Sequence, residues 1–213
     1  GSRILVQESI YDEFVEKLVA KASTIRIGNP ADDDTQLGPV ISERQRKRVL
    51  GYVDIARDEG GRIALGGSAP ALAPPLDNGF FVEPTIVAEA RNDMRCAQEE
   101  IFGPVAVVVP FGDESDAVDK ANDIPFGLGS AVWTRDVARA HRVASKIEAG
   151  MVWINDHHRL DPASPWGGVK ESGIGREGGN ESFEDFTHIR SVMVRTAETE
   201  VDWYGDERPT RLN

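Results

Sequence analysis

Gln98-Glu99-Glu100-Ile101-Phe102-Gly103-Pro104-Val105 is the stretch that does most to decide the fold, because it places a fixed turn directly before an apolar run. The Gly103-Pro104 pair predicts the turn. The run Val105–Pro110 predicts a strand that is buried on both faces. Two carboxylates and an aromatic ring are unusual in a plain strand, so we expect the turn to aim Glu100 and Phe102 outside it. The alternative is a buried turn whose acids cap a neighbouring helix.

Strand and helix patterns alternate on both sides of this stretch. Apolar periodicity and flanking turn residues predict strands at residues 3–7, 62–65, 80–87, 129–134, 150–155 and 189–195, with Pro84 marking an edge or a break. Helices are expected after residues 9, 42 and 136, near residues 113–122 and near residues 181–186. This order predicts an α/β fold, with a mostly parallel twisted sheet flanked by helices.

Three polar residues are predicted to begin helices. Ser9 and Ser42 are expected caps, and Gln45 completes a capping-box pattern with Ser42. Asp136 is expected to begin a helix whose apolar side chains, from Val137 to Ile147, face inward.

Composition restricts the classes of function. The 213 residues are enough for one large domain or two small ones, and the net charge of −12 argues against a nucleic-acid partner. No apolar run approaches the ~20 residues that a membrane span needs. The single cysteine leaves no disulfide framework and no cysteine metal site. We therefore expect a cytoplasmic protein without a membrane partner.

Residues 156–180 form an expected long loop after a strand end, which is where α/β proteins commonly bind ligands. His157 and His158 raise the alternative of a metal site. We do not expect one, because adjacent side chains on an extended chain point in different directions and make a poor chelate. Trp166 in the same loop is either a pocket aromatic or a core tryptophan.

Eight stretches, in this order, resemble the catalytic domain of the NAD(P)-dependent aldehyde dehydrogenase superfamily across nearly the whole chain. The matching stretches are residues 2–6, 37–42, 79–85, the Glu100 run, 122–128, 150–155, 164–168 and 170–177. A single stretch of this kind is weak evidence, but eight in the family's order are strong evidence.

The resemblance implies a function and a set of site residues. Glu100 would bind the hydroxyls of the nicotinamide ribose of NAD or NADP, and Phe102 would pack beside the nicotinamide. Asp156, His157 and Trp166 would line the pocket for an aldehyde substrate. In this family a thiolate adds to the aldehyde, a hydride leaves to the nicotinamide, and water hydrolyses the thioester to a carboxylic acid. A homo-oligomer is also implied.

The family's nucleophilic cysteine, general-base glutamate and coenzyme domain would lie upstream of Ser2. The resemblance therefore implies a C-terminal portion, with residues 1–186 as part of the catalytic domain and residues 187–213 as the oligomerisation strand and tail. We expect no catalytic residue in this chain and no activity from it alone. The alternatives are an acylating semialdehyde dehydrogenase of the same superfamily and a non-catalytic interaction module with the same fold.

Three remaining features have structural interpretations. Cys96 is expected to be a small buried side chain, since no activating partner is evident. The Gly-x-Gly-x-x-Gly pattern at residues 173–178 lacks a preceding strand, so it is expected to be a close-packed loop and not a phosphate-binding site. Glu99 is expected to be solvated or to cap a helix, with its side chain diverging from Glu100.

Overall fold

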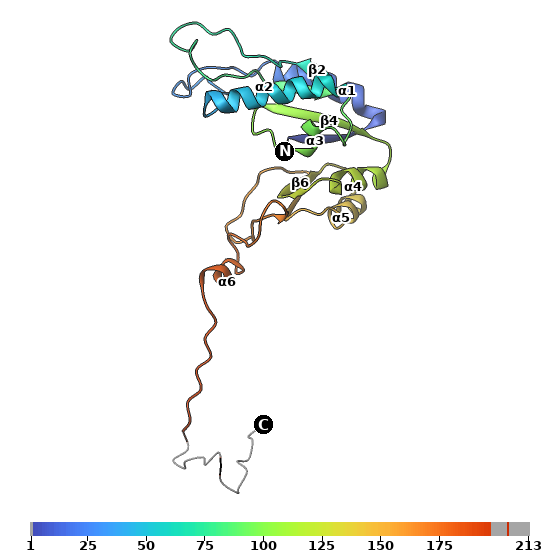
Figure 1. The fold of residues 1–213 in the computed structure, drawn as a ribbon. Coiled ribbons are helices and arrows are strands. Elements are labelled where there is room, and N and C mark those ends of the chain that lie inside the picture. Colours follow the sequence, from blue (N-terminus) through green and yellow to red (C-terminus); the bar gives the residue numbers. More distant parts are fainter. Residues whose placement is uncertain (1, 197–203, 205–213) are drawn as a thin grey trace.

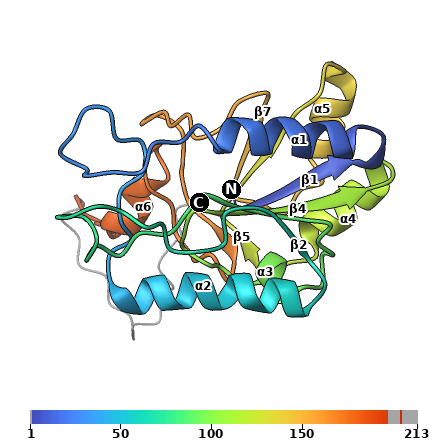
Figure 2. The same cartoon turned by 90° about the horizontal axis from the view of Figure 1, so that it is seen from above.

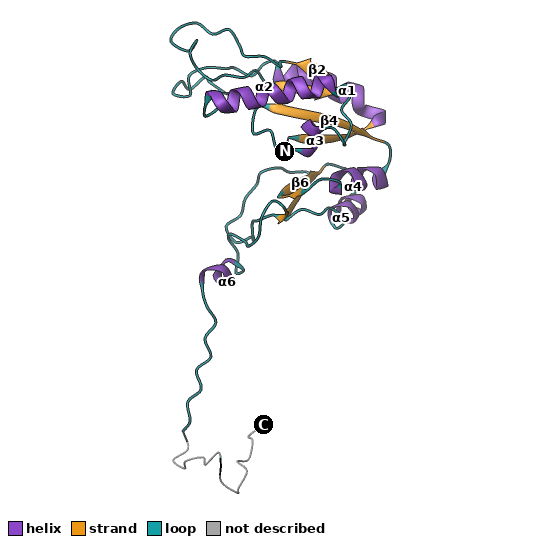
Figure 3. Ribbon diagram, viewed as in Figure 1, coloured by secondary structure: helices purple, strands orange, loops and turns teal. Residues whose placement is uncertain are grey.

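The computed structural model describes residues 2–196 and 204, and within them the elements form the predicted α/β arrangement (Figures 1 and 3). The main sheet has the order β1 (Arg3–Gln7), β4 (Val105–Phe111), β3 (Thr85–Ala88) and β2 (Arg62–Leu65). Strand β4 is parallel to β1 and to β3, while β2 is antiparallel to β3. The sheet is therefore mostly parallel, with an antiparallel strand at one edge.

Helices cover both faces of this sheet. Helix α1 (Tyr11–Ala22) lies on one face, and α2 (Glu43–Asp58) with the short α3 (Arg95–Gln98) lies on the other (Figure 2). Val108 of β4 packs in the cluster beneath α1, whereas Val107 packs in the cluster beneath α2. Successive side chains of a strand point to opposite faces, so the apolar run of β4 contributes to both cores, as predicted.

The predicted caps are right in two cases and wrong in one. The Ser42 hydroxyl accepts a hydrogen bond from the backbone N–H of Gln45 at 3.2 Å, and Asp136 caps α5 (Val137–Ala144) in the same way. Ser9 does not cap α1. It lies inside a 3-10 turn, η1 (Glu8–Ile10), so α1 begins later and without a side-chain cap.

The predicted strand at residues 80–87 is shorter than expected. Strand β3 begins only at Thr85, because Pro84 has no backbone N–H to donate. The Thr85 N–H instead donates to the carbonyl of Pro104 at 2.8 Å. The bond ties the start of β3 to the turn that precedes β4.

A second group of elements follows β4. Strands β6 (Gly129–Val132) and β7 (Met151–Ile154) pair in parallel, and β5 (Phe126–Gly127) pairs antiparallel with β8 (Val169–Lys170). Helix α5 packs against β6 and β7, whereas α4 (Glu114–Asn122) packs against β1 and β4 of the main sheet.

The apolar face of α5 is narrower than predicted. Ala140 and Val143 are buried, but Val137 is 72% exposed, so its predicted inward orientation is wrong. Val137 lies in the first turn of the helix and borders an open hollow that no other element of the described residues fills.

Arg3 joins the two groups of elements. Its guanidinium donates to the Asn92 side chain at 2.6 Å and to the carbonyls of Lys120 and Ala121 at the end of α4. Burial lowers the pKa of Arg3 and outweighs the negative charge of Asp123, which raises it. Asn92 in turn donates to the Asp123 carboxylate at 3.0 Å, so the start of β1 is fixed to α4.

Beyond α6 (Ser182–Phe186), the chain leads away from the sheets (Figure 1). The predicted strand at residues 189–195 is not formed, and the apolar side chains of Ile189, Val192, Met193 and Val194 are exposed. A strand requires a neighbour for its backbone groups, and the described residues place none beside this segment. Residues 197–203 and 205–213 of the predicted oligomerisation segment lie outside the described residues. Within the described residues, no helix is long and apolar enough to cross a bilayer.

Candidate functional site

Side chains of α2 hold the turn before β4 by its backbone. The Gln45 amide nitrogen donates to the carbonyls of Ile101 at 2.9 Å and Phe102 at 2.8 Å. The Arg48 guanidinium donates to the carbonyl of Glu100 at 2.7 Å. Three consecutive carbonyls are therefore bound by two side chains that lie one helical turn apart. In this arrangement Gln45 does not complete the predicted capping box with its own side chain.

Phe102 has a strained backbone and an exposed ring. Its φ is +55°, in a region that residues other than glycine, asparagine and aspartate seldom adopt. A backbone held there by its surroundings is strained by ~1–3 kcal/mol. Phe102 is 74% exposed, although phenylalanine is among the residues most often buried. Gly103 presses against α2, since a Cβ there would lie 2.5 Å from a Val49 methyl. The turn is thus held in a costly shape that presents an aromatic ring outward.

Glu99 and Glu100 have different surroundings. Glu100 is exposed at the surface of the turn. Glu99, which we expected to be solvated or capping, instead accepts two hydrogen bonds from Arg95, at 2.8 and 3.1 Å, and one from the Tyr52 hydroxyl. Hydrogen bonds from Arg95 and then Tyr52 lower the pKa of Glu99 to about 2. Glu99 therefore anchors the turn to α2 and α3, while Glu100 is left available for a ligand.

Glu99→Gln is expected to destabilise the fold by about 1 kcal/mol at pH 7, since the ion pair is partly exposed and screened. The folded pKa of about 2 lies below the ordinary 4.5, so the stabilisation is complete above pH 4.5 and is lost as the pH falls toward 2. Urea unfolding at pH 7 and pH 3 measures the difference in the free energy of unfolding between wild type and variant. This difference should be smaller at pH 3. Glu16→Gln, on the exposed face of α1, serves as the control. An equal difference in the free energy of unfolding at both pH values would contradict the role given to Glu99.

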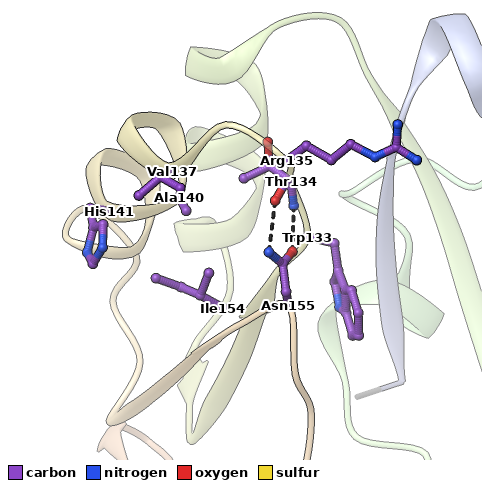
Figure 4. Close-up of a pocket in the computed structure, with 8 residues that line it drawn as sticks. All are labelled: Trp133, Thr134, Arg135, Val137, Ala140, His141, Ile154 and Asn155. Atoms are coloured by element: carbon purple, nitrogen blue, oxygen red, sulfur yellow. Dashed lines mark hydrogen bonds between the residues drawn. The ribbon is translucent and has the colours of Figure 1, made fainter.

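The loop after β7 begins at Asn155, whose side chain links the end of β7 to the end of β6. The Asn155 side chain accepts from the Thr134 N–H and donates to the Thr134 carbonyl, both at 2.9 Å (Figure 4). Its φ is +52°. Trp133, Val137 and Ile154 line the open hollow beside this pair. Asn155 thereby fixes the point from which the loop containing Asp156 departs.

Trp153 of β7 organises the predicted substrate residues. Its ring centre lies 5.5 Å from that of His157 and 5.9 Å from that of Trp166, and its indole N–H donates to the Arg159 carbonyl at 2.8 Å. Trp153 itself is buried, Trp166 is half-buried and His157 is exposed. Trp166 is therefore neither a core residue nor a free surface residue. It covers the buried Trp153.

The two histidines do not diverge as predicted. Their rings stack, with centroids 4.1 Å apart, because His158 has a φ of +61° that turns the chain back. Partial desolvation of the exposed His157 ring, followed by the charge of His158, lowers the pKa of His157, which favours its neutral form. The Asp156 carboxylate accepts a hydrogen bond from the backbone N–H of His157 at 2.8 Å. Among the described residues, no three His, Cys, Asp or Glu side chains come together in a way that could hold a metal ion.

The glycine-rich segment is a loop, as predicted, and it packs against Trp166. Trp166 and Glu177 exchange two backbone hydrogen bonds of 2.7 Å. Gly175 and Gly178 have φ values of +80° and +68°, and a Cβ on Gly178 would lie 3.0 Å from the Pro162 carbonyl. The glycines allow the segment to pass closely under residues 162–166.

Cys96 is 3% exposed and belongs to the core cluster between α2 and the sheet. Burial raises the pKa of its thiol to about 11. At neutral pH it is a protonated thiol without access to solvent, which matches its predicted role as a small core residue.

The predicted site residues form two separate groups. Glu100 and Phe102 lie on the turn before β4, and Asp156, His157 and Trp166 lie on the loop after β7. Within residues 2–196, no hydrogen bond, ion pair or ring contact joins the two groups. The sequence pattern did not single out Gln45 and Arg48 as holding the turn, or Trp153 and Asn155 as supporting the loop. For the support of the loop, the sequence offered one indication, the apolar Trp153 within a strand directly before the loop.

A model described as the aldehyde dehydrogenase family matches residues 1–192. The chain belongs to the aldehyde dehydrogenase family. It is 45% identical to a betaine aldehyde dehydrogenase of Mesorhizobium japonicum, over 93% of this chain and 40% of that protein. It is 43% identical to the betaine aldehyde dehydrogenase of Bacillus subtilis, over 96% of this chain and 41% of that protein.

Solved structures of aldehyde dehydrogenases agree with the fold. A betaine aldehyde dehydrogenase from Staphylococcus aureus in complex with NAD+ is 44% identical, with a TM-score of 0.90 over 96% of this chain and 41% of that one. An aldehyde dehydrogenase from Burkholderia cenocepacia is 52% identical, with a TM-score of 0.87 over 90% of this chain and 39% of that one. The predicted family and the α/β fold class are therefore confirmed. The chain spans about two fifths of the length of these relatives.

Proposed function

We propose that this chain is part of an enzyme that oxidises an aldehyde to a carboxylic acid with NAD or NADP. Within it, Glu100 binds the nicotinamide ribose and Phe102 borders the nicotinamide. Asp156, His157 and Trp166 line the aldehyde pocket. The chain alone is inactive, because it supplies walls of the site and no nucleophile.

The single observation that carries this proposal is the turn at residues 100–102. Its backbone is held by Gln45 and Arg48, its Phe102 is strained, and its Glu100 carboxylate and Phe102 ring both face solvent. A carboxylate can accept hydrogen bonds from two ribose hydroxyls, and an exposed aromatic ring can cover a planar heterocycle. These residues fit a nicotinamide nucleotide. A bound NAD or NADP would supply the hydride acceptor for the oxidation.

The loop after β7 fits an aldehyde pocket. Trp166 rests on Trp153, and His157 is placed against the same ring, so aromatic side chains form a continuous surface at the loop. The neutral form of His157 that its lowered pKa favours adds a polar group without a fixed charge. The betaine aldehyde dehydrogenases among its relatives make betaine aldehyde a natural member of a test panel.

The proposal extends to assembly. Residues 1–186 form the catalytic-domain portion, and residues 187–213 form the strand and tail through which subunits of a homo-oligomer pair. The exposed apolar side chains of Ile189, Val192, Met193 and Val194 support this division, because a segment of this kind is stabilised when it adds to a sheet edge of another subunit.

The test is turnover of the full-length protein with a panel of aldehydes, including betaine aldehyde, and with NAD and NADP. We expect oxidation of at least one aldehyde. We also expect Trp166→Ala to shift the preference toward bulky aldehydes by about 1–3 kcal/mol, the scale of one hydrophobic pocket contact. Since Trp166 is half-buried, the fold should lose less than the ~3–5 kcal/mol of a fully buried Trp→Ala change.

Trp133→Ala is the matched control, because Trp133 is a 68% exposed tryptophan without a ring contact to Trp153. Its ratio of activities on bulky and small aldehydes should stay at the wild-type value. A large fall in melting temperature for Trp166→Ala with an unchanged ratio would show that Trp166 serves mainly to stabilise the fold, and would contradict its pocket role. Absence of turnover with every aldehyde would contradict the proposed activity.

A further inference from the structure

The loop after β7 gathers three aromatic rings around the buried Trp153. The centre of the Trp153 ring lies 5.5 Å from that of His157 and 6.1 Å from that of His158. The Trp166 ring lies 5.9 Å from it. Both histidines are exposed and Trp166 is half-buried, so all three rings border solvent on one connected surface.

The two histidines of this surface are stacked, and their stacking depends on their charge. Their ring centres are 4.1 Å apart and their planes are inclined by 29°. The φ of +61° at His158 brings the rings together. An imidazole is ordinarily neutral above about pH 6.5 and positive below it. Two neutral rings can stack at this distance, whereas two positive rings repel each other, so the loop carries a pair of groups whose charge follows pH.

Neighbouring acids offset a proton on this pair only in part. Asp156 raises the pKa of His157, but its carboxylate already accepts from the His157 backbone N–H and lies 4.0 Å from the Arg159 guanidinium. Loss of hydration, the charge of His158 and the amino terminus of the chain lower that pKa, and together they outweigh Asp156. In a longer chain a peptide bond would replace the amino terminus. The two tryptophans packed against the pair carry no charge.

We infer that the His157–His158 stack selects aldehydes by charge. The pocket accepts a cationic aldehyde while both rings are neutral and disfavours it when a ring is protonated. The face of a tryptophan attracts a quaternary ammonium group, so the neutral surface suits such a cation, whereas an imidazolium on the same surface repels it. This inference rests on the proposed aldehyde pocket, and it adds the charge class of the substrate and its dependence on pH.

The test compares betaine aldehyde with its tert-butyl analogue, in which carbon replaces the ammonium nitrogen. The two compounds have the same shape, and neither gains or loses a proton. The ratio of their kcat/KM values in the full-length protein therefore cancels the effects of pH on the chemical step. This ratio should fall by about 3- to 10-fold from pH 8 to pH 5, the scale of one repulsive charge in a partly exposed site screened by salt. A compound that is not turned over is measured as a competitive inhibitor instead.

The variant that tests the assignment combines His157→Gln with His158→Asn, which removes both titrating rings. Asparagine tolerates a positive φ, so the course of the loop is kept. The ratio in this double variant should be the same at pH 8 and pH 5. His141→Gln is the matched control, because His141 is an exposed histidine of α5 whose ring makes no contact with Trp153 in the described part of the chain. It should show the full fall in the ratio.

Three results would overturn the inference and leave the proposed activity intact. The first is a wild-type ratio that is equal at both pH values while aldehydes are oxidised. The second is an equal fall in the wild type and the double variant, because the titrating group would then lie elsewhere. The third is betaine aldehyde that neither reacts nor competes at pH 8. If the wild type oxidises no aldehyde at any pH, the proposed function itself fails, and the charge selection fails with it.

Discussion

The isolated 213-residue chain should show no aldehyde-dependent formation of NADH or NADPH, whereas the full-length protein should show it. The chain contains one cysteine, Cys96, which is 3% exposed and whose pKa is raised to about 11 by burial. A buried, protonated thiol cannot add to an aldehyde. The chain also spans only about two fifths of the length of its relatives.

The measurement is absorbance at the NADH band with equal molar amounts of both proteins. Cys96→Ala in the full-length protein is the control, and it should keep turnover near the wild-type value with a stability loss of about 1 kcal/mol for a small core truncation. Turnover by the isolated chain that disappears with Cys96→Ala would contradict both the predicted inactivity and the structural role of Cys96.

Glu100→Gln in the full-length protein should lower turnover by about 1.5–3 kcal/mol in activation free energy, the net value of hydrogen bonds to a charged group. In rate this is about 10- to 150-fold. The loss should appear in turnover because hydride transfer needs an aligned nicotinamide ring. The melting temperature should not change, because Glu100 is exposed and makes no ion pair in the described chain.

Glu16→Gln is the control for the loss of one exposed carboxylate, since Glu16 lies on α1 across the sheet from the turn. Coenzyme affinity is measured alongside turnover by titrating the protein's fluorescence with NAD and NADP. Wild-type values of both turnover and affinity in Glu100→Gln would show that Glu100 does not bind the ribose.

The sequence by itself determined the features that depend on near neighbours in the chain. The apolar run Val105–Pro110 is a strand that packs on both faces, because a side chain at every position is apolar. Ser42 and Asp136 begin helices, because a short polar side chain can reach a backbone N–H three residues on. The Gly103-Pro104 turn and the family resemblance also follow from residues that are adjacent in the sequence.

Only the tertiary structure decided the features that depend on distant residues. Gln45 binds the turn across 56 residues of sequence, and no local pattern predicts such a bond. The stacking of His157 on His158 requires a positive φ at His158, and Trp153 provides the surface against which the pair packs. Val137 fits the helical period, yet it is exposed because, among the described residues, no element covers its end of α5.

The C-terminal segment shows the same division between local and distant causes. Alternation and β-branched residues predict a strand at residues 189–195, but a strand forms only where a neighbour accepts its backbone hydrogen bonds. The β-strand propensity of the segment depends on its own residues. Pairing depends on a second segment, and for Ile189 to Val194 the described residues supply none.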